Sequence, residues 1–150
     1  GADVLFQHTD SSAAMTIAEE KGVYAFGQAS NMIDFGPNAQ ATGIMNDWGP
    51  YYVERVQALK DGTWTSSDTF SGVDSGMVKF APMNKNLPRD VKNEAARAII
   101  DLAMGKIHPF TGPINKQDGS PWLAEGETAP IGDLLGMQFY VEGIDSLFPN

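Results

Sequence analysis

Cysteine is absent from the 150 residues, and histidine occurs only twice. Without cysteine, the chain has no disulfide framework and no thiolate for metal or redox chemistry. The two histidines, His8 and His108, stand far apart, and no paired carboxylates accompany them at the spacing of metal ligands. We therefore predict that the protein binds no metal and needs no cofactor.

Positive charge is also scarce. The 10 Lys and Arg residues are outnumbered by 19 Asp and Glu residues, which gives a formal net charge of −9. Nucleic acid and anionic membrane surfaces repel such a chain, and no run of basic residues offsets the repulsion. No apolar run approaches the length that spans a bilayer. We therefore expect no nucleic-acid partner and no membrane-spanning segment.

The composition is that of a globular domain, with 42% hydrophobic and 19% charged residues. Gly1–Gln7 is predicted to be a short buried strand. An Ala-rich helix follows and ends at Gly22, and Val23–Gly27 forms a second strand. A continuous apolar strand is typical of a parallel sheet that is covered on both faces. The predicted fold class is therefore α/β.

Later segments extend this pattern. A helix that begins near Asp47 is predicted to bury a stripe of apolar side chains, namely Tyr52, Val53, Val56 and Leu59. Residues 63–74 are polar and predict a loop or a β-ribbon. Two further strands are predicted at Ala41–Met45 and Gly76–Ala81, and a long helix is predicted at Pro88–Met104. Leu134–Leu147 is predicted to be a closing helix or a strand followed by a helix.

Polar side chains gather where the first three predicted strands stop. In open α/β sheets, ligands bind in the crevice outside the carboxyl ends of the strands. Amide and carboxylate groups there would hydrogen-bond a neutral, flat ligand, and an aromatic side chain would stack on it. The candidate ligand-binding residues are Gln7, His8, Thr9, Asp10, Gln28, Asn46, Asp47 and Trp48.

Some of these residues also have an ordinary structural explanation. Asp10 and Asp47 each precede a predicted helix. Capping the N-terminus of that helix therefore explains each aspartate as well as ligand binding does. Trp48 begins a predicted helix and belongs either to the core or to the rim of the site. Phe6 alternates with Leu5 in a strand that is predicted to be buried, which favours a place in the core.

The usual catalytic motifs are missing. Residues 72–76 resemble a nucleophile elbow, but the serine stands one position late. No glycine-rich phosphate-binding motif follows a strand. Acid–base or nucleophilic catalysis by His8, Asp10 and Ser11 is disfavoured, because near neighbours at a strand end point their side chains in different directions. The sequence therefore favours a binding protein over an enzyme.

Four segments resemble the basic membrane protein (BMP) family, whose members are substrate-binding components of ABC importers. They include a Gln-His-Thr-Asp motif and an Asn-Asp-Trp-Gly-Pro motif. The four segments are Gly1–Ser11, Tyr24–Ser30, Asn46–Tyr52 and His108–Ile114. The resemblance covers essentially the whole chain and corresponds to about the second half of a family member.

The resemblance implies a type I periplasmic-binding-protein fold, in which two Rossmann-like lobes close on a ligand. The chain would be the C-terminal part of such a protein and would contain one three-layer lobe. Residues 1–104 would form most of the ligand-binding lobe, 105–114 a hinge passage, and 115–150 a closing segment. We expect a longer protein, because the chain opens directly on a strand.

The implied ligand is a purine base or nucleoside, and the implied partners are ABC permease subunits. The full-length protein would be lipid-anchored, periplasmic or at the cell surface. Ala29 stands where nucleoside receptors carry an aspartate suited to ribose, and Asn46 replaces an expected lysine, and both departures weaken the case for a nucleoside. The Gln-His-Thr-Asp and Asn-Asp-Trp-Gly-Pro pattern instead resembles that of family members that bind a free purine base such as adenine. The alternatives are a sugar- or amino-acid-type receptor or sensor on the same fold and, less favoured, a small nucleoside-processing enzyme.

Overall fold

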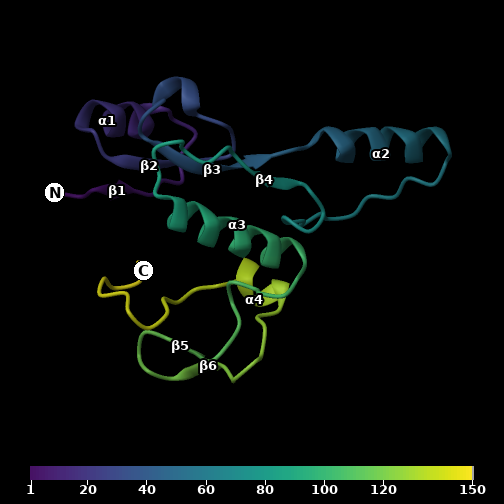
Figure 1. Cartoon of the computed structure of the whole chain (residues 1–150). Coiled ribbons are helices and arrows are strands. Elements are labelled where there is room, and N and C mark those ends of the chain that lie inside the picture. Colours follow the sequence, from purple (N-terminus) through teal and green to yellow (C-terminus); the bar gives the residue numbers. More distant parts are fainter. Residues whose placement is uncertain (150) are drawn as a thin grey trace. The chain divides into compact units, whose positions relative to one another are not determined.

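The structure is a computed structural model and describes residues 1–149. The chain divides into two compact units, which meet in sequence between Met104 and Gly105. Figure 1 draws the first unit in purple to green and the second in green to yellow. Within residues 1–149, no helix is both long and apolar enough to cross a lipid bilayer.

The first unit is built on a four-stranded sheet with the order β1-β2-β3-β4. The strands β1 (Val4–Leu5), β2 (Tyr24–Gly27) and β3 (Gln40–Asn46) are parallel, and β4 (Val78–Phe80) runs antiparallel to β3. A mixed α/β fold with a parallel sheet was predicted from the strand–helix–strand pattern, and that fold class is confirmed.

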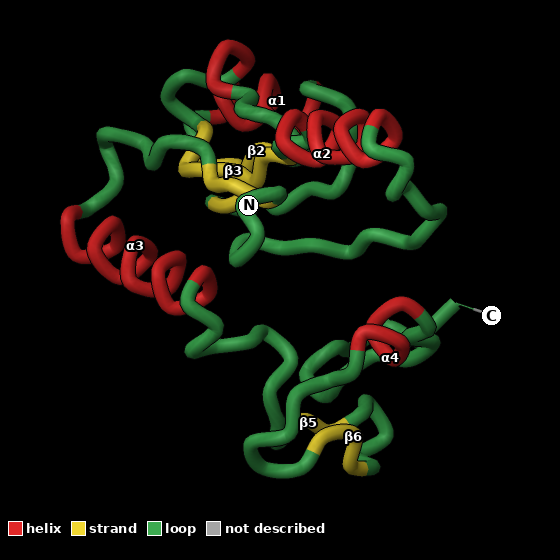
Figure 2. Tube along the Cα trace, turned by 90° about the vertical axis from the view of Figure 1, so that its right-hand side faces the viewer, coloured by secondary structure: helices red, strands yellow, loops and turns green. Residues whose placement is uncertain are grey.

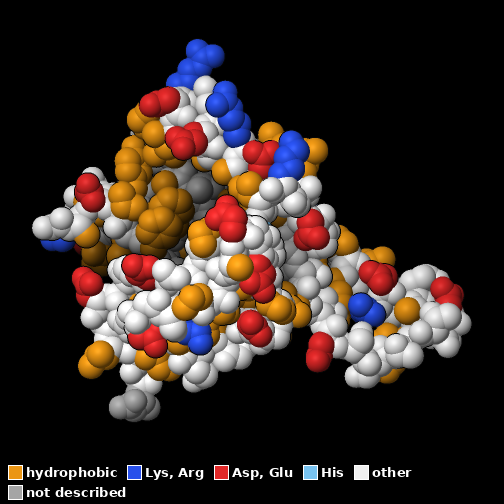
Figure 3. All heavy atoms as spheres, turned by 90° about the horizontal axis from the view of Figure 1, so that it is seen from below, with side chains coloured by type: hydrophobic (Ala, Val, Ile, Leu, Met, Phe, Trp, Pro, Cys, Tyr) orange, Lys and Arg blue, Asp and Glu red, His pale blue; other side chains and the backbone are white. Residues whose placement is uncertain are grey.

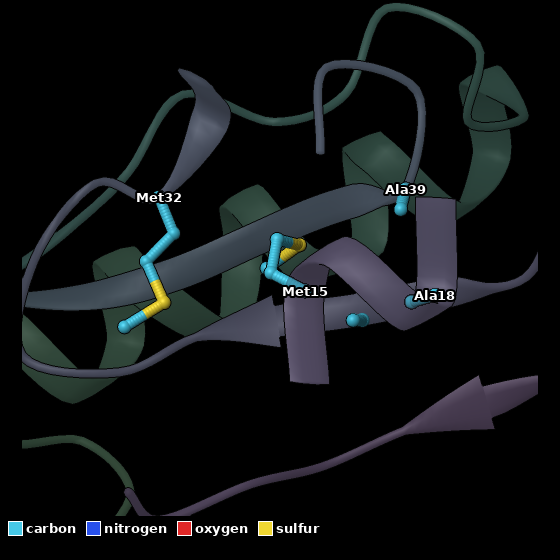
Figure 4. Close-up of a cluster of buried hydrophobic side chains, with 5 residues drawn as sticks. Met15, Ala18, Met32 and Ala39 are labelled. Atoms are coloured by element: carbon cyan, nitrogen blue, oxygen red, sulfur yellow. The ribbon is translucent and has the colours of Figure 1, made fainter. Parts of the chain in front are cut away.

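Helix α1 (Ala13–Lys21) connects β1 to β2 and lies on one face of the sheet (Figures 1 and 2). Gly22 ends it in the left-handed region with φ of 67°, where glycine carries no steric penalty. The buried core between helix and sheet consists of small and flexible side chains, as Figure 4 shows. Its members are Met15, Ala18, Ala25, Met32 and Ala39.

A carboxylate on α1 fixes the entry to β3. One Glu19 oxygen accepts the backbone N–H groups of Asn38 and Ala39 at 2.8 and 2.7 Å. The other accepts the Asn38 side-chain amide at 2.6 Å. These bonds, with the Asn38 side chain foremost, hold the pKa of Glu19 below its ordinary value. The folded state therefore favours the ionised carboxylate.

Glu19→Gln is expected to destabilise the protein at neutral pH but not in acid. Because the folded-state pKa of Glu19 is lowered, its stabilisation is fully present above the unfolded-state pKa and is lost as pH falls through the folded-state value. The stabilities of wild type and variant, measured by urea unfolding, should differ at pH 7 and converge as pH falls below the folded-state pKa of Glu19. Glu20→Gln is the matched control, and a difference independent of pH would contradict the prediction.

The predicted strand Gly1–Gln7 is wrong in its length and burial. Only Val4–Leu5 is a strand, and the Phe6 side chain is 74% exposed rather than in the core. Phe6 stacks one face on the ring of Phe26, at 4.2 Å between centroids. The reason is the position of β1 at the edge of the sheet, where only β2 pairs with it in the described part of the chain.

The apolar stripe predicted for the second helix exists but is not buried. Helix α2 (Gly49–Lys60) places Tyr52, Val53, Val56 and Leu59 in solvent, with exposures between 59% and 71%. Helix α3 (Arg89–Ala103) also buries none of its residues. An amphipathic pattern marks the face that would pack, but burial also needs a surface to pack against, and residues 1–104 leave these faces uncovered.

The second unit is a small antiparallel hairpin with an aromatic cluster. Strands β5 (Ile114–Asn115) and β6 (Pro121–Leu123) pair, and the short helix α4 (Ile131–Leu135) follows. The helix, or strand plus helix, predicted from Leu134 to Leu147 is wrong, because α4 ends at Leu135 and the chain leaves the helix at Gly136. The Glu142 N–H instead donates to the Asn115 carbonyl at 3.0 Å, and Gly143 is left-handed.

Candidate functional site

The carboxyl ends of β1, β2 and β3 meet at one edge of the sheet, because the three strands are parallel neighbours. The Gln7 side-chain amide donates to the Phe26 carbonyl at 3.4 Å and thereby links the ends of β1 and β2. The Asn46 N–H donates to the Ala29 carbonyl at 3.1 Å and links β3 to the turn after β2. Residues from all three strand ends are thus brought to the same edge.

The turn after β2 is strained at one residue. Ala29 has a φ of 59°, in the left-handed region that side chains other than glycine rarely adopt. The buried Gln40 holds this turn: its side-chain oxygen accepts the Met32 N–H at 2.8 Å, and its amide donates to Asn31 at 2.7 Å. Gln28, which begins the turn, is half-buried.

The segment after β1 is exposed and polar. The Thr9 hydroxyl donates to the Gln7 side-chain oxygen at 3.0 Å, and His8 and Asp10 lie in solvent. Asp10 is not the residue that caps α1, because the helix begins after Ser12. The Ser11 hydroxyl accepts the Ala13 N–H at 3.2 Å instead. The capping explanation for Asp10 is therefore wrong, and its carboxylate faces water at this edge.

Asp47 is bound on both of its carboxylate oxygens. One forms an ion pair with Lys79 of β4 at 2.5 Å, and the other accepts the Gly49 N–H at 3.3 Å. The hydrogen bond from Lys79, followed by that from Gly49, holds the pKa of Asp47 below its ordinary value. Trp48, not Asp47, stands at the N-cap of α2. The Asp47 charge is thus directed toward β4.

Trp48 and Asn46 share a concavity with a loop that precedes β4. Trp48 is 43% exposed and contacts the rings of Tyr51 and Tyr52, with centroids 5.6 and 6.0 Å away. The concavity has a volume of about 180 Å³. Its lining residues are Asn46, Trp48, Thr69, Phe70, Ser71, Met77 and Val78.

Sequence reasoning missed the contribution of this loop. Because β4 is antiparallel to β3, residues before β4 lie at the edge where β3 ends, and Asn46 pairs directly with Val78. The orientation of β4 is a long-range property that residues 63–74 do not reveal. One local signal was present, since Phe70 and Trp64 are aromatic residues in an otherwise polar segment.

The described residues offer acceptors and donors for a neutral ligand rather than a metal centre. Within residues 1–149, no group of three or more His, Cys, Asp or Glu side chains lies close enough to hold a metal ion. Acidic side chains are spread over the face of the molecule that Figure 3 shows, with fewer basic ones among them. Amide groups such as those of Gln7 and Asn46 can both donate and accept hydrogen bonds.

Two solved structures resemble part of the chain and show its fold. A transcriptional activator of the comK gene from Bacillus halodurans has a TM-score of 0.62 over 71% of this chain and 38% of its own, at 18% identity. An ABC transporter solute-binding protein from Conexibacter woesei has a TM-score of 0.51 over 72% of this chain and 37% of its own, also at 18% identity.

Two curated relatives match the chain over its full length. A purine-binding protein of Brucella abortus is 50% identical over 150 residues, which are 43% of that protein. A putative ABC transporter glucose-binding protein of Haloferax volcanii is 23% identical over 150 residues, 36% of its length. The chain therefore spans less than half the length of either relative.

The family itself is identified by a match over residues 1–117 to Bmp, described as ABC transporter substrate-binding protein PnrA-like. The resemblance predicted from the sequence motifs is thereby confirmed. This chain belongs to the Bmp family of PnrA-like ABC transporter substrate-binding proteins.

Proposed function

We propose that the chain is part of the solute-binding component of an ABC importer and that its ligand is a purine base or nucleoside, with an adenine-like base favoured. Residues 1–104 form most of one ligand-binding lobe in this proposal, 105–114 pass through a hinge, and 115–150 close the structure. The protein performs no chemistry on its ligand. Lobe closure buries the ligand and creates the surface that the permease recognises.

One observation carries this proposal: three parallel strands end at a single edge, where Asn46 and Trp48 line one concavity. Amides of Gln7, Gln28 and Asn46 match the alternating donors and acceptors of a heterocycle, and Trp48 supplies an aromatic face. His8, Thr9, Asp10 and Asp47 complete the proposed contact set. The 50% identity to a purine-binding protein supports the same ligand class.

The proposed cellular setting follows from the family. A substrate-binding component of an importer works outside the cytoplasmic membrane, in the periplasm or at the cell surface, and docks on its permease subunits. We propose that the full-length protein is held there by a lipid anchor outside these 150 residues. Globomycin-sensitive processing of the full-length precursor, or its absence, would test the anchor.

Isothermal titration of the full-length protein with adenine, adenosine, guanosine and glucose tests the ligand. We expect adenine to bind with a dissociation constant in the micromolar range or below, which corresponds to a binding free energy of about −8 kcal/mol or a more negative one. Adenosine should bind more weakly. Equal affinities in the millimolar range for all the purines would contradict the purine proposal. Preference for glucose would favour the sugar-receptor alternative, for which the glucose-binding relative is the supporting observation.

Trp48→Ala is expected to weaken purine binding about tenfold, because stacking on an aromatic face contributes roughly 0.5–1.5 kcal/mol beyond area burial. Trp64→Ala is the matched control, since Trp64 is 49% exposed but lines a separate concavity beside α2. Titration calorimetry measures both. An unchanged affinity in Trp48→Ala would favour a sugar- or amino-acid-type receptor, which needs less stacking.

The enzyme alternative has a separate test. Incubation with a panel of nucleosides is expected to show no turnover by chromatography. Turnover that disappears in Asp10→Asn would identify a nucleoside-processing enzyme instead, with Asp10 as its acid or base.

A further inference from the structure

Phe70 is an aromatic side chain held in solvent by an ordered loop. It is 68% exposed, yet the loop that carries it is fixed to the start of β4. The Val78 N–H donates to the Gly72 carbonyl at 3.2 Å, and the Ser75 hydroxyl donates to the same oxygen at 2.9 Å. A phenylalanine side chain kept in water forgoes the favourable free energy of burial. Because Phe70 also lines a concavity, its ring is available to contact a ligand there.

The place of Phe70 in the sheet brings it near the end of β3. Asn46 is the partner of Val78 across the β3–β4 ladder, so the loop before β4 faces the residues that follow β3. Phe70 and Trp48 accordingly line the same concavity. Thr69 and Ser71, which both carry hydroxyl groups, flank Phe70 in this lining. Aromatic surface and hydrogen-bonding groups therefore occur together in one small hollow.

We propose that Phe70 is a second aromatic contact for the ring system of the ligand, acting together with Trp48, and that it sets the preference for a flat heterocycle. This inference rests on the proposed function. The Asn46 amide and the two neighbouring hydroxyls hydrogen-bond the edge of the ring. Two aromatic walls with a polar edge select a flat, nitrogen-containing ring over a saturated sugar, because only the flat ring presents a π-face to both.

The size of the concavity limits which part of the ligand it holds. Its volume of about 180 Å³ is below the range of roughly 300–1,000 Å³ that is usual for complete small-molecule sites. The concavity therefore receives the base alone. Strands β1 and β3 are separated by roughly 10 Å, two interstrand spacings, so the β1 end contacts the edge of the base that faces away from β4.

Phe6 is the competing aromatic residue at this edge, since it is exposed at the β1 end with one face on Phe26. The two positions make different predictions. If the base binds at the β3–β4 end, Phe70→Ala weakens adenine binding about tenfold and Phe6→Ala leaves it within about twofold. Phe70→Tyr, which keeps the ring, should retain the wild-type affinity. Phe35→Ala, at another half-exposed phenylalanine, is the matched control.

The experiment uses the full-length protein, adenine and titration calorimetry, with thermal unfolding of each variant to show that it is folded. A second readout is the fluorescence of Trp48 in a full-length protein whose other tryptophans, Trp64 and Trp122 among them, are replaced by phenylalanine. Adenine should quench this fluorescence, and Phe70→Leu should weaken the affinity measured by quenching in the same way. Leucine keeps an apolar side chain but removes the π-face.

The outcomes separate this inference from the proposed function. A wild-type protein that binds no purine overturns the proposed function, and the role of Phe70 falls with it. A wild-type protein that binds adenine, with Phe70→Ala within twofold of it, overturns the inference alone. Loss of adenine binding in Phe6→Ala instead would show that the base binds at the β1 end, and this result would also overturn the inference about Phe70.

Discussion

Gly43→Ala is expected to cost about 3 kcal/mol of folding stability or more, one of the two largest losses that we predict for a single substitution in this chain. A methyl group on Gly43 would lie 2.7 Å from the Cα and the carbonyl oxygen of Gly27, its neighbour on β2. These are backbone atoms, which cannot turn aside as a side chain does. Strands β2 and β3 would have to separate, and the ends of both carry candidate site residues.

Urea unfolding followed by far-UV circular dichroism measures this loss. Gly132→Ala is the matched control, because the same methyl group meets nothing within 4 Å there and adds helix propensity in α4. The control should be neutral or more stable by up to about 1 kcal/mol. A Gly43→Ala protein within about 0.5 kcal/mol of wild type would show that the two strands tolerate a wider spacing.

Gln40→Met is expected to cost about 2–4 kcal/mol and to loosen the turn after β2. Gln40 is fully buried, and its side chain satisfies the Met32 N–H and binds Asn31. Methionine fills a similar volume but offers no comparable acceptor, so the Met32 N–H would be left buried without a partner. The buried Asn84 side chain, which donates to the Gln40 carbonyl at 2.8 Å, would keep the β3 backbone in place.

Two measurements distinguish this loss from a general loss of packing. Hydrogen exchange should show faster exchange of the Met32 amide than of the amides in β3 that keep their partners. Gln57→Met, on the exposed surface of α2, is the matched control and should change stability by less than about 0.5 kcal/mol. Unchanged protection of the Met32 amide would mean that another acceptor, such as water, replaces the glutamine oxygen.

The parallel sheet could be predicted from local signals. The Ala-rich helix, the glycine that ends it and the apolar segments around it define a strand–helix–strand unit, and the shared edge follows from that unit. The length and burial of β1 could not be predicted in the same way. Phe6 looks like a core residue within an apolar run, but the burial of an edge strand depends on neighbours that the run does not specify.

The contributions of Gln40 and Phe70 depend on contacts between distant segments. In the sequence, Gln40 is only a polar residue that precedes a predicted strand. Its burial is possible because its side chain forms hydrogen bonds with the Met32 N–H and the Asn31 side chain. Phe70 reaches the candidate site through the antiparallel pairing of β3 and β4. No pattern within a short window reports such pairings. The apolar spacing in 134–147 likewise predicts a helix, but Gly136 and the left-handed Gly143 interrupt it.

The open apolar stripes of α2 and α3 bear on how the stability of this chain varies with temperature. The heat-capacity increment of unfolding arises mainly from apolar surface that becomes hydrated, and these side chains are already hydrated in the folded state. The increment should therefore fall below the roughly 2 kcal/mol/K usual for a chain of this length. A smaller increment flattens the stability curve, so the chain would change little in stability between cold and moderate temperatures.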